Sequence, residues 1–138
     1  MVEDNPDDAM LTRQALVEAS VSCSVEHVTD GLEAIDRLGC ATPDSAPASK
    51  LPHLILLDLK LPKLGGLGVL EKLRANPATR CVPVVMFTTS TEEKDISDCF
   101  GKGANSYVQK PVDYDELLVL MNKVSYYWGK ISQSPISD

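Results

Sequence analysis

Long apolar runs are absent from this sequence, and no stretch approaches the roughly 20 residues that a membrane-crossing helix needs. The N-terminus also lacks the apolar segment of a signal peptide. Basic residues are in deficit, with 13 lysines and arginines against 20 aspartates and glutamates and a net charge of −7. An acidic chain has no electrostatic reason to bind nucleic acid or an anionic membrane. We therefore expect a cytoplasmic protein without nucleic-acid or membrane partners.

Paired cysteine motifs are also absent. The four cysteines form no C-x-x-C pair, and their spacings do not match those of zinc sites. They are Cys23, Cys40, Cys81 and Cys99. We expect four free thiols in a reducing compartment.

The length of 138 residues suits one domain with its own core. No internal repeat or long linker divides it, so we expect one domain over residues 1–131. Residues 132–138 are polar and include Pro135, which predicts a frayed tail.

Predicted strands and helices alternate along the chain. The apolar runs 54–57 and 82–87 are typical of strands buried on both faces of a parallel sheet, and 24–29 and 106–109 are weaker strand candidates. Helical patterns cover 8–19, the segment from 30 to 38, 67–75, the segment from 91 to 100, and 113–128. This alternation predicts an α/β fold with a doubly wound parallel sheet.

The predicted first strand is almost missing, because only Met1 and Val2 precede the acidic residues. A buried strand usually has about five residues. We therefore expect either a longer native chain, with several apolar residues upstream, or another segment in that place.

Polar residues with compatible chemistry follow the predicted strands. They are Glu3 and Asp4, Asp58, Thr88 and Thr89, and Lys110. The carboxyl ends of parallel strands form the usual ligand-binding edge. Converging carboxylates repel one another, and a hard cation such as Mg²⁺ relieves that repulsion. An aspartate can accept a phosphoryl group, whose oxygens a hydroxyl and an ammonium can hold.

Four motifs in order make the sequence similar to the CheY-like receiver family. They are V-E-D-N at 2–5, L-L-D-L-K-L-P at 56–62 with Gly65 and Gly66, V-V-M-F-T-T at 84–89, and Y-V-Q-K-P at 107–111. The resemblance implies a flavodoxin-like sheet of five strands in the order 2-1-3-4-5. It also implies a response regulator that accepts a phosphoryl group from a histidine kinase, rather than an enzyme acting on other substrates.

The same resemblance implies roles for individual residues. Asp58 is the expected phosphoacceptor. Mg²⁺ is expected on Asp4, Asp58 and the backbone carbonyl of Lys60, with Glu3 acting through a bound water. The phosphoryl group is expected to contact Thr88, Thr89 and Lys110. Thr88 and Tyr107 form the expected switch pair, the Lys110–Pro111 peptide is expected to be cis, and Lys60 and Ser90 flank the route of the attacking water.

Three aromatic residues, Tyr126, Tyr127 and Trp128, end the last predicted helix. They could pack on their own domain or form an interface. Together with the loop 41–50, they resemble features of the receivers paired with bacterial phytochrome kinases. That resemblance implies a phytochrome-class kinase partner and a homodimer through the last strand and helix.

Two other functions are compatible with parts of the pattern. Phosphatases with an aspartate nucleophile use similar residues, but they need a D-x-D pair, and Lys60 stands where the second aspartate would be. A receiver-like binding module that is never phosphorylated would have a damaged site, whereas this site is complete in sequence.

Overall fold

The computed structural model describes residues 1–48 and 50–137. Three parallel strands form a sheet in the order β1-β2-β3. They are β1 (Ile55–Leu57), β2 (Val84–Thr88) and β3 (Ser106–Gln109). The helices are α1 (Pro6–Glu18), α2 (Gly31–Leu38), α3 (Gly66–Ala75), α4 (Glu93–Gly101) and α5 (Tyr114–Tyr126), followed by a π-helical segment, η1 (Tyr127–Ile131).

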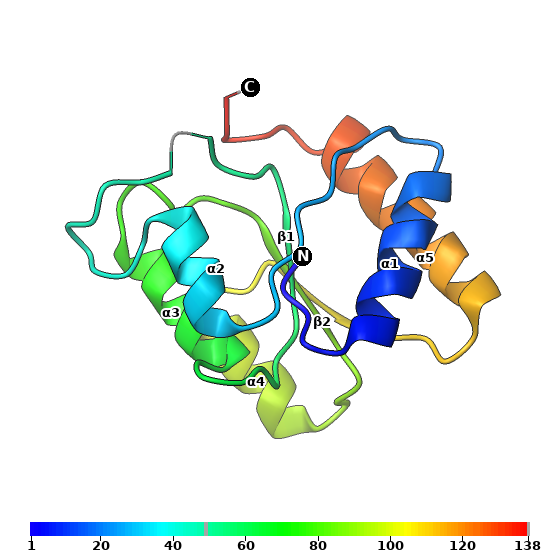
Figure 1. Cartoon of the computed structure of the whole chain (residues 1–138), viewed down its shortest axis with the longest axis horizontal. Coiled ribbons are helices and arrows are strands. Elements are labelled where there is room, and N and C mark those ends of the chain that lie inside the picture. The colour runs from blue at the N-terminus through cyan, green and yellow to red at the C-terminus, as the bar shows by residue number, and fades with distance from the viewer. Residues whose placement is uncertain (49, 138) are drawn as a thin grey trace.

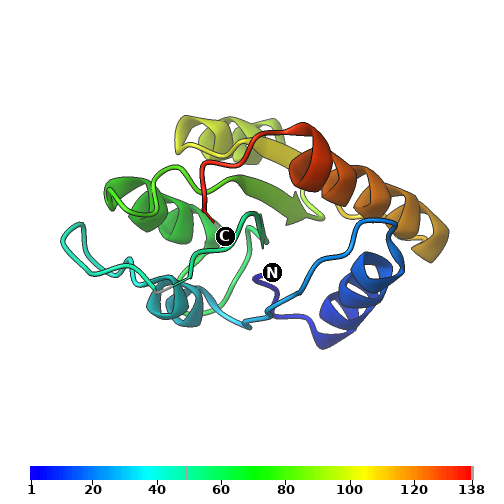
Figure 2. The same ribbon diagram turned by 90° about the horizontal axis from the view of Figure 1, so that it is seen from above.

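Helices cover both faces of the sheet (Figures 1 and 2). One layer contains α1 and α5, which pack against each other, and the other contains α2, α3 and α4. Side chains alternate between the two cores: Leu56 and Val85 face the α1–α5 layer, whereas Leu57 and Met86 face the other layer. Burial on both faces explains the unbroken apolar runs of these strands.

The predicted five-stranded sheet is only partly present. Within residues 1–48 and 50–137, three strands form, and Val2 adds one parallel bridge to Val28 and another to Leu57. The strand predicted over 24–29 is wrong apart from that bridge. A strand pair needs a ladder of backbone hydrogen bonds. Among the described residues, the backbone of 24–29 is bonded to that of Met1–Glu3 at Glu26 and Val28 only.

Helix α1 begins immediately after the N-terminal acids. Asn5 is its N-cap, and the side-chain oxygen of Asn5 accepts hydrogen bonds from the backbone N–H groups of Asp7 and Asp8. Pro6 occupies the first helical position, where a missing N–H has no cost. The cap therefore belongs to Asn5, and the side chain of Asp8 is left available for other contacts.

The tail contacts the domain at one residue at least. Ile136 is partly buried and packs against the core beneath α2 and α3. Figure 2 shows the C-terminal segment crossing back from η1 over the sheet towards the start of β1. No helix within the described ranges is long and apolar enough to cross a membrane.

All four cysteines are free in the structure. Cys23 and Cys81 are exposed, whereas Cys40 and Cys99 are fully buried. Burial raises the pKa of the Cys99 thiol to about 11, because desolvation disfavours the thiolate.

We expect iodoacetamide to modify two thiols of the folded protein and four of the unfolded protein. The thiolate is the reacting form, so the buried thiols are protected by both their inaccessibility and their high pKa. Mass spectrometry of the intact protein and of its peptides measures this. Labelling of Cys40 or Cys99 at the rate of Cys23 would contradict the structure.

Candidate functional site

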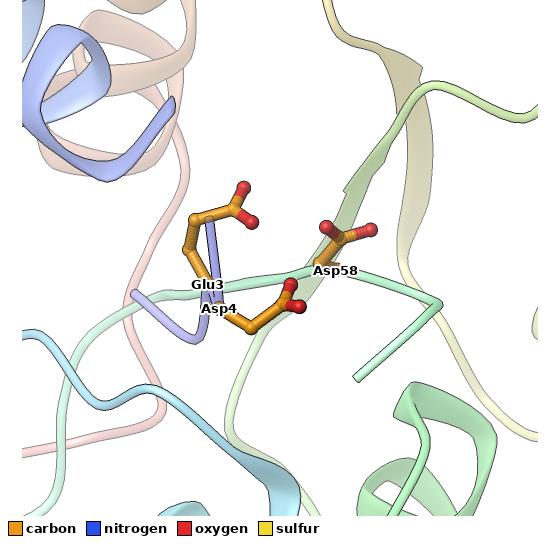
Figure 3. A group of neighbouring side chains, drawn as sticks. All are labelled: Glu3, Asp4 and Asp58. Carbon is orange, nitrogen blue, oxygen red and sulfur yellow. The ribbon is translucent and has the colours of Figure 1, made fainter. Parts of the chain in front are cut away.

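Three carboxylates meet at the carboxyl edge of the sheet, as the sequence predicts. One oxygen each of Glu3, Asp4 and Asp58 lies within 4.8 Å of the others (Figure 3). Glu3 and Asp58 are buried, at 3% and 8% exposure, whereas Asp4 is exposed. The cluster therefore has two desolvated acids and one acid open to solvent.

Backbone hydrogen bonds bring these acids together from distant parts of the chain. The Val2 N–H donates to the Leu56 carbonyl at 2.8 Å, and the Asp58 N–H donates to the Val2 carbonyl at 3.1 Å. On the other side of the N-terminal segment, the Glu3 N–H donates to the Val28 carbonyl at 3.1 Å. The three residues Met1–Glu3 thus take the place of a longer strand and direct the acids that follow to Asp58.

Gly66 allows the loop after Asp58 to fold tightly. The Gly66 N–H donates to the Leu59 carbonyl at 2.8 Å. A Cβ at this position would collide with the backbone carbonyl oxygen of Asp58. The start of α3 can therefore lie directly against the site only because residue 66 has no side chain.

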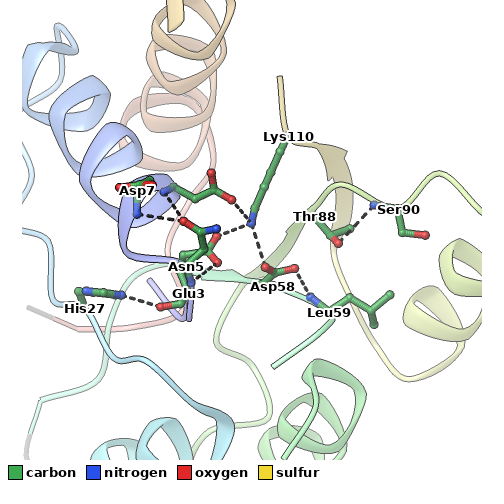
Figure 4. A network of polar contacts seen from close by, with 10 residues as sticks. Glu3, Asn5, Asp7, His27, Asp58, Leu59, Thr88, Ser90 and Lys110 are labelled. Carbon is green, nitrogen blue, oxygen red and sulfur yellow. Dashed lines mark hydrogen bonds and ion pairs between the residues drawn. The ribbon is translucent and has the colours of Figure 1, made fainter. Parts of the chain in front are cut away.

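Lys110 joins the cluster from the end of β3 (Figure 4). Its ammonium, with a side chain only 8% exposed, contacts a carboxylate oxygen of Glu3 and lies 2.9 Å from Asp58 Oδ2. It also lies 3.2 Å from Asp8 Oδ2. Sequence reasoning missed Asp8, although a helix that begins directly after the acidic motif carries its first-turn acids to the same edge.

The charges of the cluster shift the ionisation of its members. Burial raises the pKa of the Glu3 carboxyl to about 7, although the Lys110 ammonium acts to lower it. Burial acts to lower the pKa of Lys110, but its hydrogen bonds to Glu3 and Asp58 outweigh that effect and raise it above the ordinary value. One ammonium is therefore not enough to offset the desolvation of Glu3.

The residues that follow β2 form the opposite side of the site. Thr88 is buried, and its backbone carbonyl accepts the Lys110 N–H at 2.8 Å, which places the two residues side by side. The side chain of Thr89 is exposed. The Tyr107 hydroxyl donates to the Ser90 carbonyl at 2.9 Å, so this half-buried ring is anchored on the loop between β2 and α4.

The prediction of a cis peptide at Lys110–Pro111 is wrong, because this peptide bond is trans. The trans form of a bond before proline is favoured by only about 0.5–1 kcal/mol, so the local sequence does not determine the isomer. Lys60 is exposed and lies in the loop after Asp58. The predicted role of its carbonyl as a metal ligand stays a prediction.

The three aromatic residues after α5 divide between core and surface. Trp128 is partly buried and packs against the core shared by α1 and α5. Its ring meets that of Tyr127 edge to face, with centroids 5.0 Å apart. Tyr126 and Tyr127 are about half exposed.

The donor set of the cluster suits a hard divalent cation. Carboxylate oxygens are the ligands that Mg²⁺ prefers, and the open side next to Asp4 leaves room for metal-bound water. A cation would also relieve the repulsion between Glu3 and Asp58, which Lys110 offsets only in part.

Comparison with known proteins identifies the family. Residues 1–122 match the response regulator receiver domain. This chain belongs to that family. Its receiver domain is 33% identical over 135 residues to the probable methanogenesis regulatory protein FilR2 of Methanothrix harundinacea, which covers 98% of this chain and 85% of FilR2.

Solved structures of phytochrome response regulators share the receiver fold. The phosphorylated cyanobacterial phytochrome response regulator RcpA is 32% identical, with a TM-score of 0.85 over 97% of this chain and 94% of RcpA. The Mn²⁺-bound form of Rcp1, a protein of Synechocystis sp., is 30% identical, with a TM-score of 0.82 over 97% of this chain and 95% of Rcp1. The receiver domain is therefore one of two-component signalling, as the sequence motifs predict.

We expect the ionisation of Glu3 to change stability with pH in the presence of a chelator. The pKa of Glu3 is about 7 in the folded protein against an ordinary value of 4.5, so the folded state binds more protons between these pH values. The free energy of unfolding should therefore fall as the pH rises through this window. Urea unfolding in EDTA, compared between the wild type and Glu3→Gln, measures the effect.

The matched control for this experiment is Glu71→Gln, which removes an exposed carboxylate from α3. Its stability should follow the wild-type pH profile, whereas that of Glu3→Gln should be flatter. Parallel profiles for all three proteins would contradict the raised pKa of Glu3.

Proposed function

We propose that this receiver domain accepts a phosphoryl group on Asp58 from a histidine kinase, in a reaction that depends on Mg²⁺. The observation that carries the proposal is the buried carboxylate of Asp58, which lies 2.9 Å from the Lys110 ammonium and beside two further acids. A carboxylate desolvated next to a fixed cation can act as a nucleophile, and the ammonium can stabilise the charge of the transferred group.

The side chains around Asp58 have complementary roles in this proposal. Asp4, Asp58 and the Lys60 carbonyl would hold Mg²⁺ directly, and Glu3 would act through a metal-bound water. The ion would supply positive charge to the phosphoryl oxygens. Lys110 and the hydroxyl of Thr88 hold those oxygens from the opposite side. Thr89, which is exposed at the mouth of the site, supplies a further hydroxyl or N–H. Asp58 is the only residue that becomes covalently modified.

Labelling with acetyl phosphate tests this function. With Mg²⁺ present, we expect the wild type to gain the mass of one phosphoryl group, and Asp58→Asn to gain none, because an amide is not a nucleophile here. Asp44→Asn, which removes an exposed acid from the loop before β1, should be labelled like the wild type. Steady hydrolysis of phosphate monoesters or a failure of the wild type to be labelled would overturn the proposal.

The kinase partner is proposed to be of the phytochrome class, since RcpA is described as a phytochrome response regulator. Two exposed apolar side chains flank the site: Met10, which is 60% exposed on α1, and Val112, which lies fully exposed two residues after Lys110. Exposed apolar residues beside a reactive group are suited to docking a protein partner.

Substitution of these two residues should affect phosphorylation by the kinase but not phosphorylation by a small phosphodonor. We expect Met10→Glu and Val112→Asp each to slow phosphotransfer from the kinase about tenfold, since each places a charge in an apolar contact. Labelling by acetyl phosphate should stay unchanged. Leu32→Glu on α2, which is 47% exposed in the wild type, is the control and should alter neither reaction. Equal effects on both phosphodonors would contradict this docking surface.

The second proposed partner is another copy of this chain, which would form a homodimer through β3 and α5. A groove of about 450 Å³ lies on the outer face of α5, where Val119 is 53% exposed. Its lining includes Asp115 and Glu116 at one end and Lys123 at the other. Two copies related by a two-fold axis would place the acids of one copy opposite the lysine of the other.

Light scattering during size exclusion tests the homodimer. We expect a dimer for the wild type and a monomer for Val119→Asp, because the new charge lies at the centre of the proposed contact. Val17→Asp, at an exposed position on α1, should remain dimeric. A monomer for the wild type at high concentration, with and without beryllofluoride, would contradict this part of the proposal.

A further inference from the structure

The hydroxyl of Ser90 has two hydrogen-bond partners, Asp95 in the first turn of α4 and the N-cap residue Glu92. It donates to Asp95 Oδ2 at 2.6 Å, the length of a charge-assisted hydrogen bond. It also accepts the backbone N–H of Glu92 at 3.3 Å. With its donor and one acceptor position in use, this hydroxyl is directed to the start of α4.

The backbone of Ser90 contacts both members of the predicted switch pair. Its carbonyl accepts the Tyr107 hydroxyl at 2.9 Å. Its N–H points to Thr88 Oγ1 at 3.4 Å (Figure 4). Thr88 lies beside Lys110 at the phosphoacceptor site, and Tyr107 lies on β3. A single loop residue is therefore bonded to the site, to the switch ring and to the first turn of α4.

Asp95 is half-buried in the first turn of α4, and it contacts neither Asp58 nor Lys110 through any hydrogen bond or ion pair of the described residues. A carboxylate there benefits from the partial positive charge at a helix N-terminus. Its neighbour Asp98 is also on α4, but it pairs with Lys94 at 2.8 Å instead of contacting the loop. The two acids thus differ in their contact with Ser90.

We propose that Asp95 is a positioning residue of the switch, which fixes Ser90 so that its carbonyl receives Tyr107 and its N–H faces Thr88. This proposal rests on the proposed function of Asp58. Loss of the bond frees the loop, so the orientation of Tyr107 becomes less defined and Thr88 is less well placed for a phosphoryl oxygen. Asp95 acts through Ser90 alone, so removing either partner has the same effect.

Fluorine NMR of protein labelled with 3-fluorotyrosine tests the positioning of Tyr107. Tyr107→Phe assigns its signal among the four tyrosines. In Asp95→Ala and in Ser90→Ala the Tyr107 signal should move towards its value in the unfolded protein, whereas Asp98→Ala should leave it in place. This measurement needs no phosphodonor, so it decides the proposal even if Asp58 is not phosphorylated.

The affinity for beryllofluoride in the presence of Mg²⁺ tests whether Asp95 and Ser90 affect the phosphoacceptor site through Thr88. Beryllofluoride is used here as a mimic of the phosphoryl group. Ser90→Ala and Asp95→Ala should each weaken it about three- to tenfold, the effect expected for the loss of one ordinary hydrogen bond. The double variant should be no weaker than either single variant, because both remove the same bond. Ser90→Thr keeps the hydroxyl and should restore wild-type affinity.

Two results would overturn the inference. One is an unchanged Tyr107 signal in a folded Asp95→Ala protein, with circular dichroism as the check of folding. The other is an additive loss in the double variant, or an equal loss in Asp98→Ala. If Asp95→Ala does not fold, Ser90→Ala decides in its place, since it removes the same hydrogen bond from the loop side.

Discussion

The placement of Val2 between two neighbouring backbone segments is the constraint on which the site depends. Its N–H and carbonyl bond to Leu56 and Asp58, while the flanking residues bond to Val28. Glu3 and Asp4 can reach Asp58 only because this short segment is held in the sheet direction. The energy comes from buried backbone hydrogen bonds and from the burial of Val2 itself.

The chemistry of the site follows from an imbalance of charge. Three carboxylates and one ammonium converge, and two of the carboxylates are buried. Lys110 stabilises Glu3 and Asp58 but leaves the pKa of Glu3 raised. Such an arrangement is unfavourable for stability, and it favours the binding of a cation that offsets the excess negative charge.

Hydrogen bonds of the loop after β2 connect the carboxylate cluster to β3 and α4. Thr88 shares a backbone hydrogen bond with Lys110, and the next turn of chain carries Ser90, which bonds to Tyr107 and to Asp95. A change in the position of Thr88 therefore has a short path of hydrogen bonds to β3 and α4. Of these elements, β3 leads along the chain into α5, which carries the groove of about 450 Å³.

Local patterns in the sequence determined the order of elements and the residues that carry the chemistry. The apolar runs before Asp58 and Thr88 are typical of strands buried on two faces, and parallel strands bring their carboxyl ends together. Tertiary structure alone decided that residues 24–29 pair only at Val28, that the Lys110–Pro111 bond is trans, and that Asp8 and Asp95 reach Lys110 and Ser90. Each of these depends on which partner lies opposite in space, and a partner distant in sequence leaves no local signal.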